Sequence, residues 1–120
     1  LVLFNEPTLP ADHPDAESEH DILYTADQVG RILQDAGLRV GRLGVTADPR
    51  AVLDGVRAAA PDAVFNLYEG TAAWGNSEAY VAGVLELLRV PYTGSPPQTL
   101  ILARSKPLTK KLLAGAGLPT

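Results

Sequence analysis

Short apolar runs bounded by turn residues alternate along this chain with longer segments whose apolar residues recur at helical spacing. The apolar runs predict strands at residues 1–5, 38–45, 63–67 and 92–93. The segments between them each carry one apolar stripe, which is typical of helices that cover a sheet. Together they predict an α/β fold: a small doubly wound parallel sheet of four strands in the order 2-1-3-4, with helices on both faces.

The helices are delimited by polar caps, prolines and glycines. Residues 8–21 hold two prolines, five acids and both histidines, and we expect a polar loop there. A helix is expected to begin at Ile22 and to end before Gly37, a residue suited to the left-handed conformation past a helix end. Capping residues or early prolines predict further helices beginning near residues 48, 77, 95 and 105.

Residues 64–95 organise the rest of the chain. They run from an apolar strand through a polar loop into a helix and back to a second short strand, which predicts a right-handed parallel crossover. Ligands of such sheets bind at the carboxyl ends of the strands. Those ends lie here at residues 68–70 and 94–95.

Composition narrows the class of protein. A net charge of −4 and a pI of about 5.0 disfavour nonspecific nucleic-acid binding. The absence of cysteine excludes disulfides, thiolate metal sites and a cysteine nucleophile. No apolar run is long enough to span a bilayer and no signal peptide is recognisable, so we expect a soluble, cytoplasmic protein. Both ends look cut, and we expect the first domain of a longer polypeptide.

Three groups of residues carry candidate chemistry. The acids and histidines of residues 12–21 could meet a cationic substrate, but acids that complement a helix dipole explain them better from the residues alone. A metal site made of His13, Glu17 and His20 is a weaker hypothesis, because no paired ligand motif is present. We therefore expect no metal ligands in this chain.

Glu69 and Gly70 form the second group and Lys106 the third. Glycine at a strand end lets a ligand approach the backbone, although an ordinary strand-to-helix turn explains Gly70 equally well. A lysine at a helix start, such as Lys106, opposes the helix dipole unless an anion compensates it. No phosphate-binding glycine loop of the P-loop or dinucleotide-binding type occurs, so any nucleotide must bind by another scheme.

Four sequence segments together resemble a known family. They are Gly-Val-Leu-Glu-Leu-Leu at 83–88, Val-Pro-Tyr-Thr-Gly-Ser at 90–95, Lys106 followed by Thr-Lys at 109–110, and Ala-Gly-Leu-Pro-Thr at 116–120. By their order and spacing, residues 64–120 resemble the amino-terminal domain of D-alanine:D-alanine ligases, members of the ATP-grasp superfamily. Ala-Glu-Ser-Glu at 16–19 is similar to the Ala-Glu-Arg-Glu segment of that family.

The resemblance implies a domain organisation and roles for single residues. Residues 1–104 would form the Rossmann-like pre-ATP-grasp domain, and residues 105–120 would begin the ATP-grasp region. Glu17 would help to hold the amino group of the first D-alanine, and Lys106 would reach an ATP phosphate. Glu69, Gly70 and Ser95 would be further substrate-binding residues, and the catalytic residues stay unknown. Glu17, Glu69, Ser95 and Lys106 are expected to lie along a common rim of the sheet.

The resemblance also implies an activity that this chain does not contain alone. The full-length parent would use ATP and magnesium or manganese to join two D-alanines through an acyl phosphate, for peptidoglycan synthesis. Its central and carboxy-terminal domains would supply most of the nucleotide site. We therefore expect the isolated chain to be inactive and to bind no cofactor.

Several departures from the family keep alternatives open. Glu69 stands where the family usually has histidine, the loop at residues 70–77 is longer, and Ser105 replaces an aspartate. A related ATP-grasp ligase for other amino acids would share the remaining features. A noncatalytic binding or dimerisation module on the same sheet, including a homodimer, is the alternative from another class.

Overall fold

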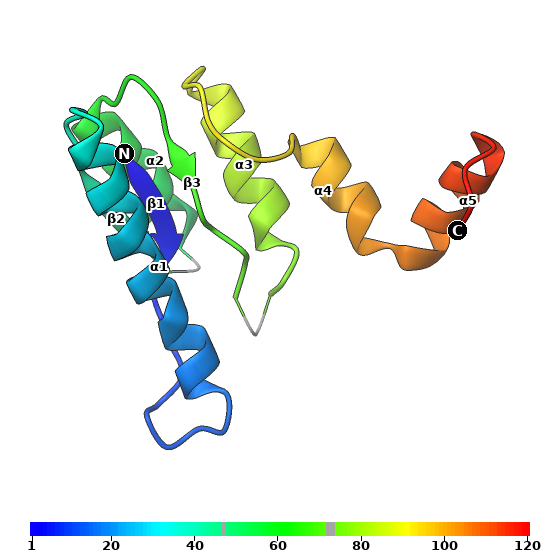
Figure 1. Cartoon of the computed structure of the whole chain (residues 1–120), viewed down its shortest axis with the longest axis horizontal. Coiled ribbons are helices and arrows are strands. Elements are labelled where there is room, and N and C mark those ends of the chain that lie inside the picture. Colours follow the sequence, from blue (N-terminus) through cyan, green and yellow to red (C-terminus); the bar gives the residue numbers. More distant parts are fainter. Residues whose placement is uncertain (47, 72–73) are drawn as a thin grey trace.

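A parallel sheet flanked by helices forms one end of the molecule, whose computed structural model describes residues 1–46, 48–71 and 74–120 (Figure 1). Within these residues β1 (Val2–Asn5) lies between β2 (Arg42–Val45) and β3 (Phe65–Asn66). Both neighbours run parallel to β1. The helices are α1 (Ala16–Asp35), α2 (Pro49–Ala59), α3 (Ser77–Leu87), α4 (Pro97–Arg104) and α5 (Lys106–Gly115).

Helices cover both faces of the sheet, as the alternating pattern predicts. Successive side chains of β1 point to opposite faces, so Val2 and Phe4 pack on one side and Leu3 on the other. Ala26 of α1 closes the first face, together with the partly buried apolar residues of the same helix. Val52 of α2 and Leu85 of α3 are in the core cluster of the second face. The prediction of an α/β fold with a parallel sheet is confirmed.

The predicted four-stranded sheet is wrong, because among the described residues the sheet has three strands in the order β2-β1-β3. Tyr92 makes only an isolated parallel bridge with Val64, next to β3. Pro91, just before it, has no amide hydrogen to donate to a ladder. Gly94, just after it, has a φ of +104° and turns the chain away. Pro91 and Gly94 therefore leave room for pairing at residues 92–93 alone.

The side chain of Thr93 also ends the pairing. Its amide donates to the carbonyl oxygen of Val64 at 3.0 Å, as in a parallel ladder. The amide of Asn66 then donates to the Thr93 hydroxyl at 3.0 Å rather than to a backbone carbonyl. A side-chain acceptor thus takes the place of the next backbone partner.

α1 begins earlier than expected, at Ala16 instead of Ile22. The polar run at residues 8–21 predicted a loop through its whole length, and that prediction is wrong for its last six residues. Ala16 is buried, and the acids that follow it lie in the first helical turn, where the helix dipole favours negative charge. The acids therefore mark the start of the helix.

Other helix boundaries follow the sequence signals. The Asp48 side chain caps α2 by accepting from the amide of Arg50 at 2.9 Å, with Pro49 in the first helical position. α5 begins at Lys106, directly after Ser105, as expected. Figure 1 shows α4 and α5 extending beyond α3, away from the sheet. None of the described helices combines the length and apolar character that a membrane crossing requires.

Candidate functional site

A polar cleft of about 500 Å³ opens at the carboxyl ends of β1 and β3. The first turns of α1, the loop after β3 and the end of α4 complete its walls. Its acidic lining residues are Asp15, Glu19, Asp21 and Glu69, and Arg104 is the basic residue that lines it. Because ligands of parallel α/β sheets bind at this edge, the cleft is the candidate site.

Glu69 and Gly70 line this cleft, at the strand end where the sequence places them. The amide of Glu69 donates to Oδ1 of Asn5, the last residue of β1, at 3.4 Å, which ties the two strand ends together. Gly70 has a φ of +95°, and a Cβ added there would lie 2.7 Å from the carbonyl oxygen of Gly75. Gly70 is therefore required by the backbone, whether or not a ligand also approaches it.

Glu19 fastens the loop that precedes α1. Its carboxylate accepts from the amides of Thr8 at 2.8 Å and Leu9 at 2.6 Å, and from the Thr8 hydroxyl at 3.0 Å. The hydrogen bond from the Leu9 amide is the largest of the effects that hold the pKa of Glu19 below its ordinary value. Glu19 is thus a carboxylate of the cleft whose charged form the fold stabilises.

Glu19→Gln is expected to reduce thermal stability at pH 7 but not at low pH. Because the folded-state pKa of Glu19 is lowered, its contribution is present above the unfolded-state pKa and is lost as the pH falls through the folded-state pKa. Thermal melts of the wild type and the variant between pH 7 and pH 3 should therefore converge at the acidic end. Glu17→Gln, an exposed glutamate of the same turn, controls for the loss of one charge near the helix start. A difference in melting temperature that stays constant with pH would contradict this role.

Three other predicted site residues lie outside the lining of the cleft. Glu17 is exposed on the first turn of α1, and Ser95 is exposed in the loop before α4. Lys106 is exposed as the first residue of α5. Figure 1 shows the start of α1 and α5 far apart in the molecule. Glu69 and Gly70 are the predicted site residues that this structure brings into one cleft.

Arg104 belongs to no motif in the sequence, yet it faces the cleft. Its Nη1 donates to Oε1 of Glu78 at 3.1 Å, across 26 positions of sequence. An arginine in the last turn of a helix is ordinary by sequence criteria, because it complements the helix dipole. Only the fold reveals that this arginine faces a cleft lined by carboxylates.

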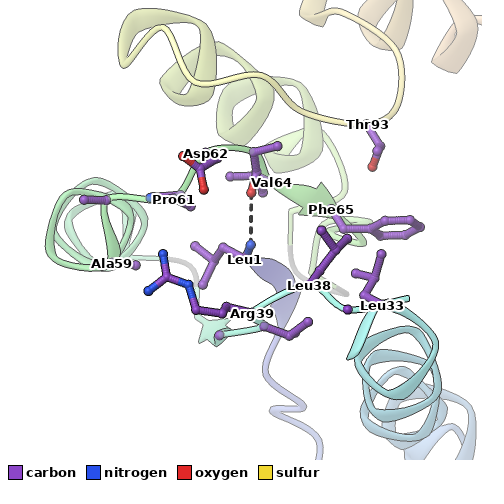
Figure 2. Close-up of a pocket in the computed structure, with 15 residues that line it drawn as sticks. Leu1, Leu33, Leu38, Arg39, Ala59, Pro61, Asp62, Val64, Phe65 and Thr93 are labelled. Atoms are coloured by element: carbon purple, nitrogen blue, oxygen red, sulfur yellow. Dashed lines mark hydrogen bonds between the residues drawn. The ribbon is translucent and has the colours of Figure 1, made fainter. Parts of the chain in front are cut away.

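A second, larger cavity of about 740 Å³ lies at the opposite edge of the sheet (Figure 2). Its lining is largely apolar and includes Leu38 and Phe65, and the amino group of Leu1 donates to the carbonyl oxygen of Ala63 at 2.9 Å. This edge holds the amino ends of the strands, so we place the candidate site at the polar cleft instead. Among the described residues, no three His, Asp or Glu side chains are grouped to hold a metal ion.

The parallel sheet with helices on both faces defines a small α/β domain, and the polar cleft lies at the carboxyl edge of its sheet. No family profile matches the chain. A D-alanine–D-alanine ligase of Ruegeria pomeroyi is 38% identical over 106 residues, which are 88% of this chain and 32% of that protein. One from Cereibacter sphaeroides is 39% identical over 103 residues, or 85% of this chain and 32% of that protein.

A third relative, the D-alanine–D-alanine ligase of Agrobacterium fabrum, is 38% identical over 87 residues, or 72% of this chain and 26% of that protein. The chain belongs to the D-alanine–D-alanine ligase family and corresponds to its amino-terminal region. It spans about a third of the length of the first two relatives. The resemblance noted in the sequence is thereby confirmed.

Proposed function

We propose that this chain is the amino-terminal domain of an ATP-dependent D-alanine:D-alanine ligase whose product serves peptidoglycan synthesis in the cytoplasm. The observation that carries the proposal is the 38% identity to a curated enzyme of that name over 88% of the chain. The polar cleft at the carboxyl edge of the sheet supports it, because an amino-acid substrate needs charged partners. The isolated chain is expected to be inactive.

The residues of this chain would bind and orient the first amino acid. Carboxylates around the cleft attract an ammonium group, and Glu69 and Gly70 stand at its wall. From the likeness to the family, Glu17 would bind the ammonium group of the substrate, and Ser95 would be a further substrate-binding residue. Lys106 is assigned to an ATP phosphate on the same ground, and the anion would compensate its unfavourable place at a helix start.

The proposed reaction has two steps. A carboxylate oxygen of the first D-alanine attacks the γ-phosphorus of ATP, the bond to the β-phosphate oxygen breaks, and ADP leaves. The amine of the second D-alanine then attacks the acyl carbon, phosphate leaves, and a proton is lost as the peptide bond forms. Positioning of the reactants supplies much of the rate enhancement in such a transfer.

The rest of the polypeptide is proposed to supply what this chain does not show. Magnesium or manganese would neutralise charge on the phosphates of ATP, but the described residues contain no metal-ligand group. We therefore assign the metal, and most of the ATP site, to the central and carboxy-terminal domains. We also propose that the pre-ATP-grasp domain comprises residues 1–104 and that the ATP-grasp region begins with residues 105–120.

A ligase for other amino acids is the second candidate function. Glu69 lines the cleft where the family usually has histidine, and it adds negative charge to a wall that already holds Asp15, Glu19 and Asp21. Replacing a basic or neutral group by an acid alters which substrate groups are favoured nearby. This difference concerns the substrate and leaves the reaction type unchanged.

Phosphate release by the full-length protein tests the proposal. With ATP, magnesium and D-alanine, we expect phosphate release that depends on D-alanine and yields the dipeptide, detected by mass spectrometry. Release with another member of a panel of D- and L-amino acids, and none with D-alanine, would support the second candidate instead. No dependence on any amino acid would reject both. The 120-residue chain serves as the negative control.

A further inference from the structure

α4 packs against α3, and α5 packs against α4. None of their residues is buried, and Figure 1 shows them as an arm beyond α3. α5 is fixed to α4 by the Thr109 hydroxyl, which donates to the carbonyl oxygen of Leu102 at 2.7 Å. Lys106 opens α5, so its position depends on how α4 is held.

Arg104, the last residue of α4, supplies a polar connection from this arm to the body. Its Nη1 donates to Oε1 of Glu78, in the first turn of α3, at 3.1 Å. Among the described residues this is the side-chain hydrogen bond that joins α4 or α5 to the rest of the chain. The Glu78 side chain is 19% exposed and the Arg104 side chain 42%, so solvent screens the pair only in part.

Gly75 leaves the space that the guanidinium occupies. A Cβ added at Gly75 would collide with Nη2 of Arg104, so any side chain there would displace the arginine. The backbone carbonyl of Gly75 in turn lies directly against Gly70. Arg104, Gly75 and Gly70 therefore form a continuous contact from the end of α4 to the wall of the cleft, next to Glu69.

We propose that Arg104 is a positioning residue that holds the arm carrying Lys106 at a fixed place relative to the cleft. We call Arg104, Glu78 and Gly75 the Arg104 latch. The proposal rests on the proposed function in one respect, that Lys106 meets ATP and the cleft meets the amino acid. Lys106 lies two residues after Arg104, so a break in the latch would shift Lys106. A misplacement of about 1 Å between reacting groups can cost about 100-fold in rate.

Hydrogen exchange on the 120-residue chain tests the latch without any activity. Arg104→Ala and Gly75→Ala are each expected to speed amide exchange in α4 and α5 by about twofold to fivefold, with β1 and α1 unchanged. Gly83→Ala is the matched control in the α3–α4 contact, because its added Cβ meets Pro97 Cγ at an ordinary 3.9 Å. Exchange in the arm that is equal in all three variants and the wild type would overturn the latch.

Kinetics of the full-length ligase test the positioning role. Arg104→Ala and Glu78→Gln are each expected to lower kcat by about 10-fold or more while KM for ATP and for the amino acid changes by less than about threefold. The double variant should cost no more than either single one, because both break one interaction. Arg104→Lys, which keeps the charge, should recover part of kcat.

Two results would overturn the positioning role. If Glu78→Gln is harmless while Arg104→Ala raises KM, the guanidinium contacts a substrate itself. If kcat falls only in proportion to the fraction of unfolded protein, measured by circular dichroism at the assay temperature, the pair is merely structural. Failure of the proposed function is a separate outcome: the wild-type enzyme would then show no amino-acid-dependent phosphate release, while the exchange experiment would still report on the latch.

Discussion

Leu85→Ala is expected to lower the free energy of unfolding of this chain by about 2–5 kcal/mol, which is a large part of the roughly 5–15 kcal/mol typical of a domain. Leu85 lies on α3 with 0% of its surface exposed, and it belongs to the core cluster that joins α3 to the sheet. The substitution removes buried methyl groups and leaves a cavity that neighbouring side chains fill only in part. Urea denaturation should show a lower midpoint with an unchanged slope.

Leu87→Ala, two positions further along the same helix, is the matched control. Leu87 is 84% exposed, so the same truncation there should change the free energy of unfolding by no more than about 0.5 kcal/mol. The comparison holds residue type and helix constant and varies only burial. Equal effects of the two substitutions would mean that α3 does not pack on the sheet through Leu85.

The sequence predicts the core of this fold because burial leaves a periodic signal. Alternation in β1 assigns Leu3 and Phe4 to opposite faces, and both are buried as expected. The cap at Asp48 is equally local, since it depends on residues one and two positions away. Interactions that depend on neighbouring residues, or on the pattern of a single element, can thus be derived from sequence.

The fourth strand could not be settled in this way. Tyr92 and Thr93 have the composition of a strand, and they do lie next to β3. Pro91 and the turn at Gly94 keep the segment short, and the Thr93 hydroxyl, which accepts a hydrogen bond from the amide of Asn66 27 positions away, takes the place of the next ladder partner. No periodicity reports such a bond, so the error lies in pairing and not in placement.

Some residues of the candidate site could be predicted from local sequence signals, and others are located only by the fold. Glu69 and Gly70 were found because a strand end fixes their location. Glu17 and Glu19 are two positions apart on α1, which rotates one side chain from the other by about 200° around the helix axis, nearly to the opposite side, so only one of them can face the cleft. The likeness to the family favours Glu17, whereas the fold directs Glu19 into the cleft, where it also fastens the loop. Arg104 left no local signal because its partner Glu78 is distant in sequence.

Lys106→Ala in the full-length enzyme is expected to lower kcat/KM for ATP by about 100-fold or more, because a cation that stabilises a transferred phosphoryl group is lost. The same substitution should leave the stability of the 120-residue chain unchanged or slightly higher. Lys106 is exposed and stands at the amino end of α5, where a positive charge is unfavourable by about 0.3–1 kcal/mol. Activity and stability are therefore expected to move in opposite directions.

Lys110→Ala supplies the control, since Lys110 is an exposed lysine one turn further along α5. It removes the same charge from the same helix, and we expect kcat/KM within about twofold of the wild type, because the proposal assigns the phosphate contact to Lys106 alone and an exposed charge that makes no direct contact is screened by salt. Steady-state assays at varied ATP concentration, run beside thermal melts, separate the two variants. If both lysines reduce kcat/KM equally, general electrostatic attraction of ATP accounts for the effect and the specific assignment of Lys106 fails. If only Lys106→Ala lowers kcat/KM and its melting temperature is unchanged, contact with the ATP phosphate explains why a lysine stands at the start of the helix.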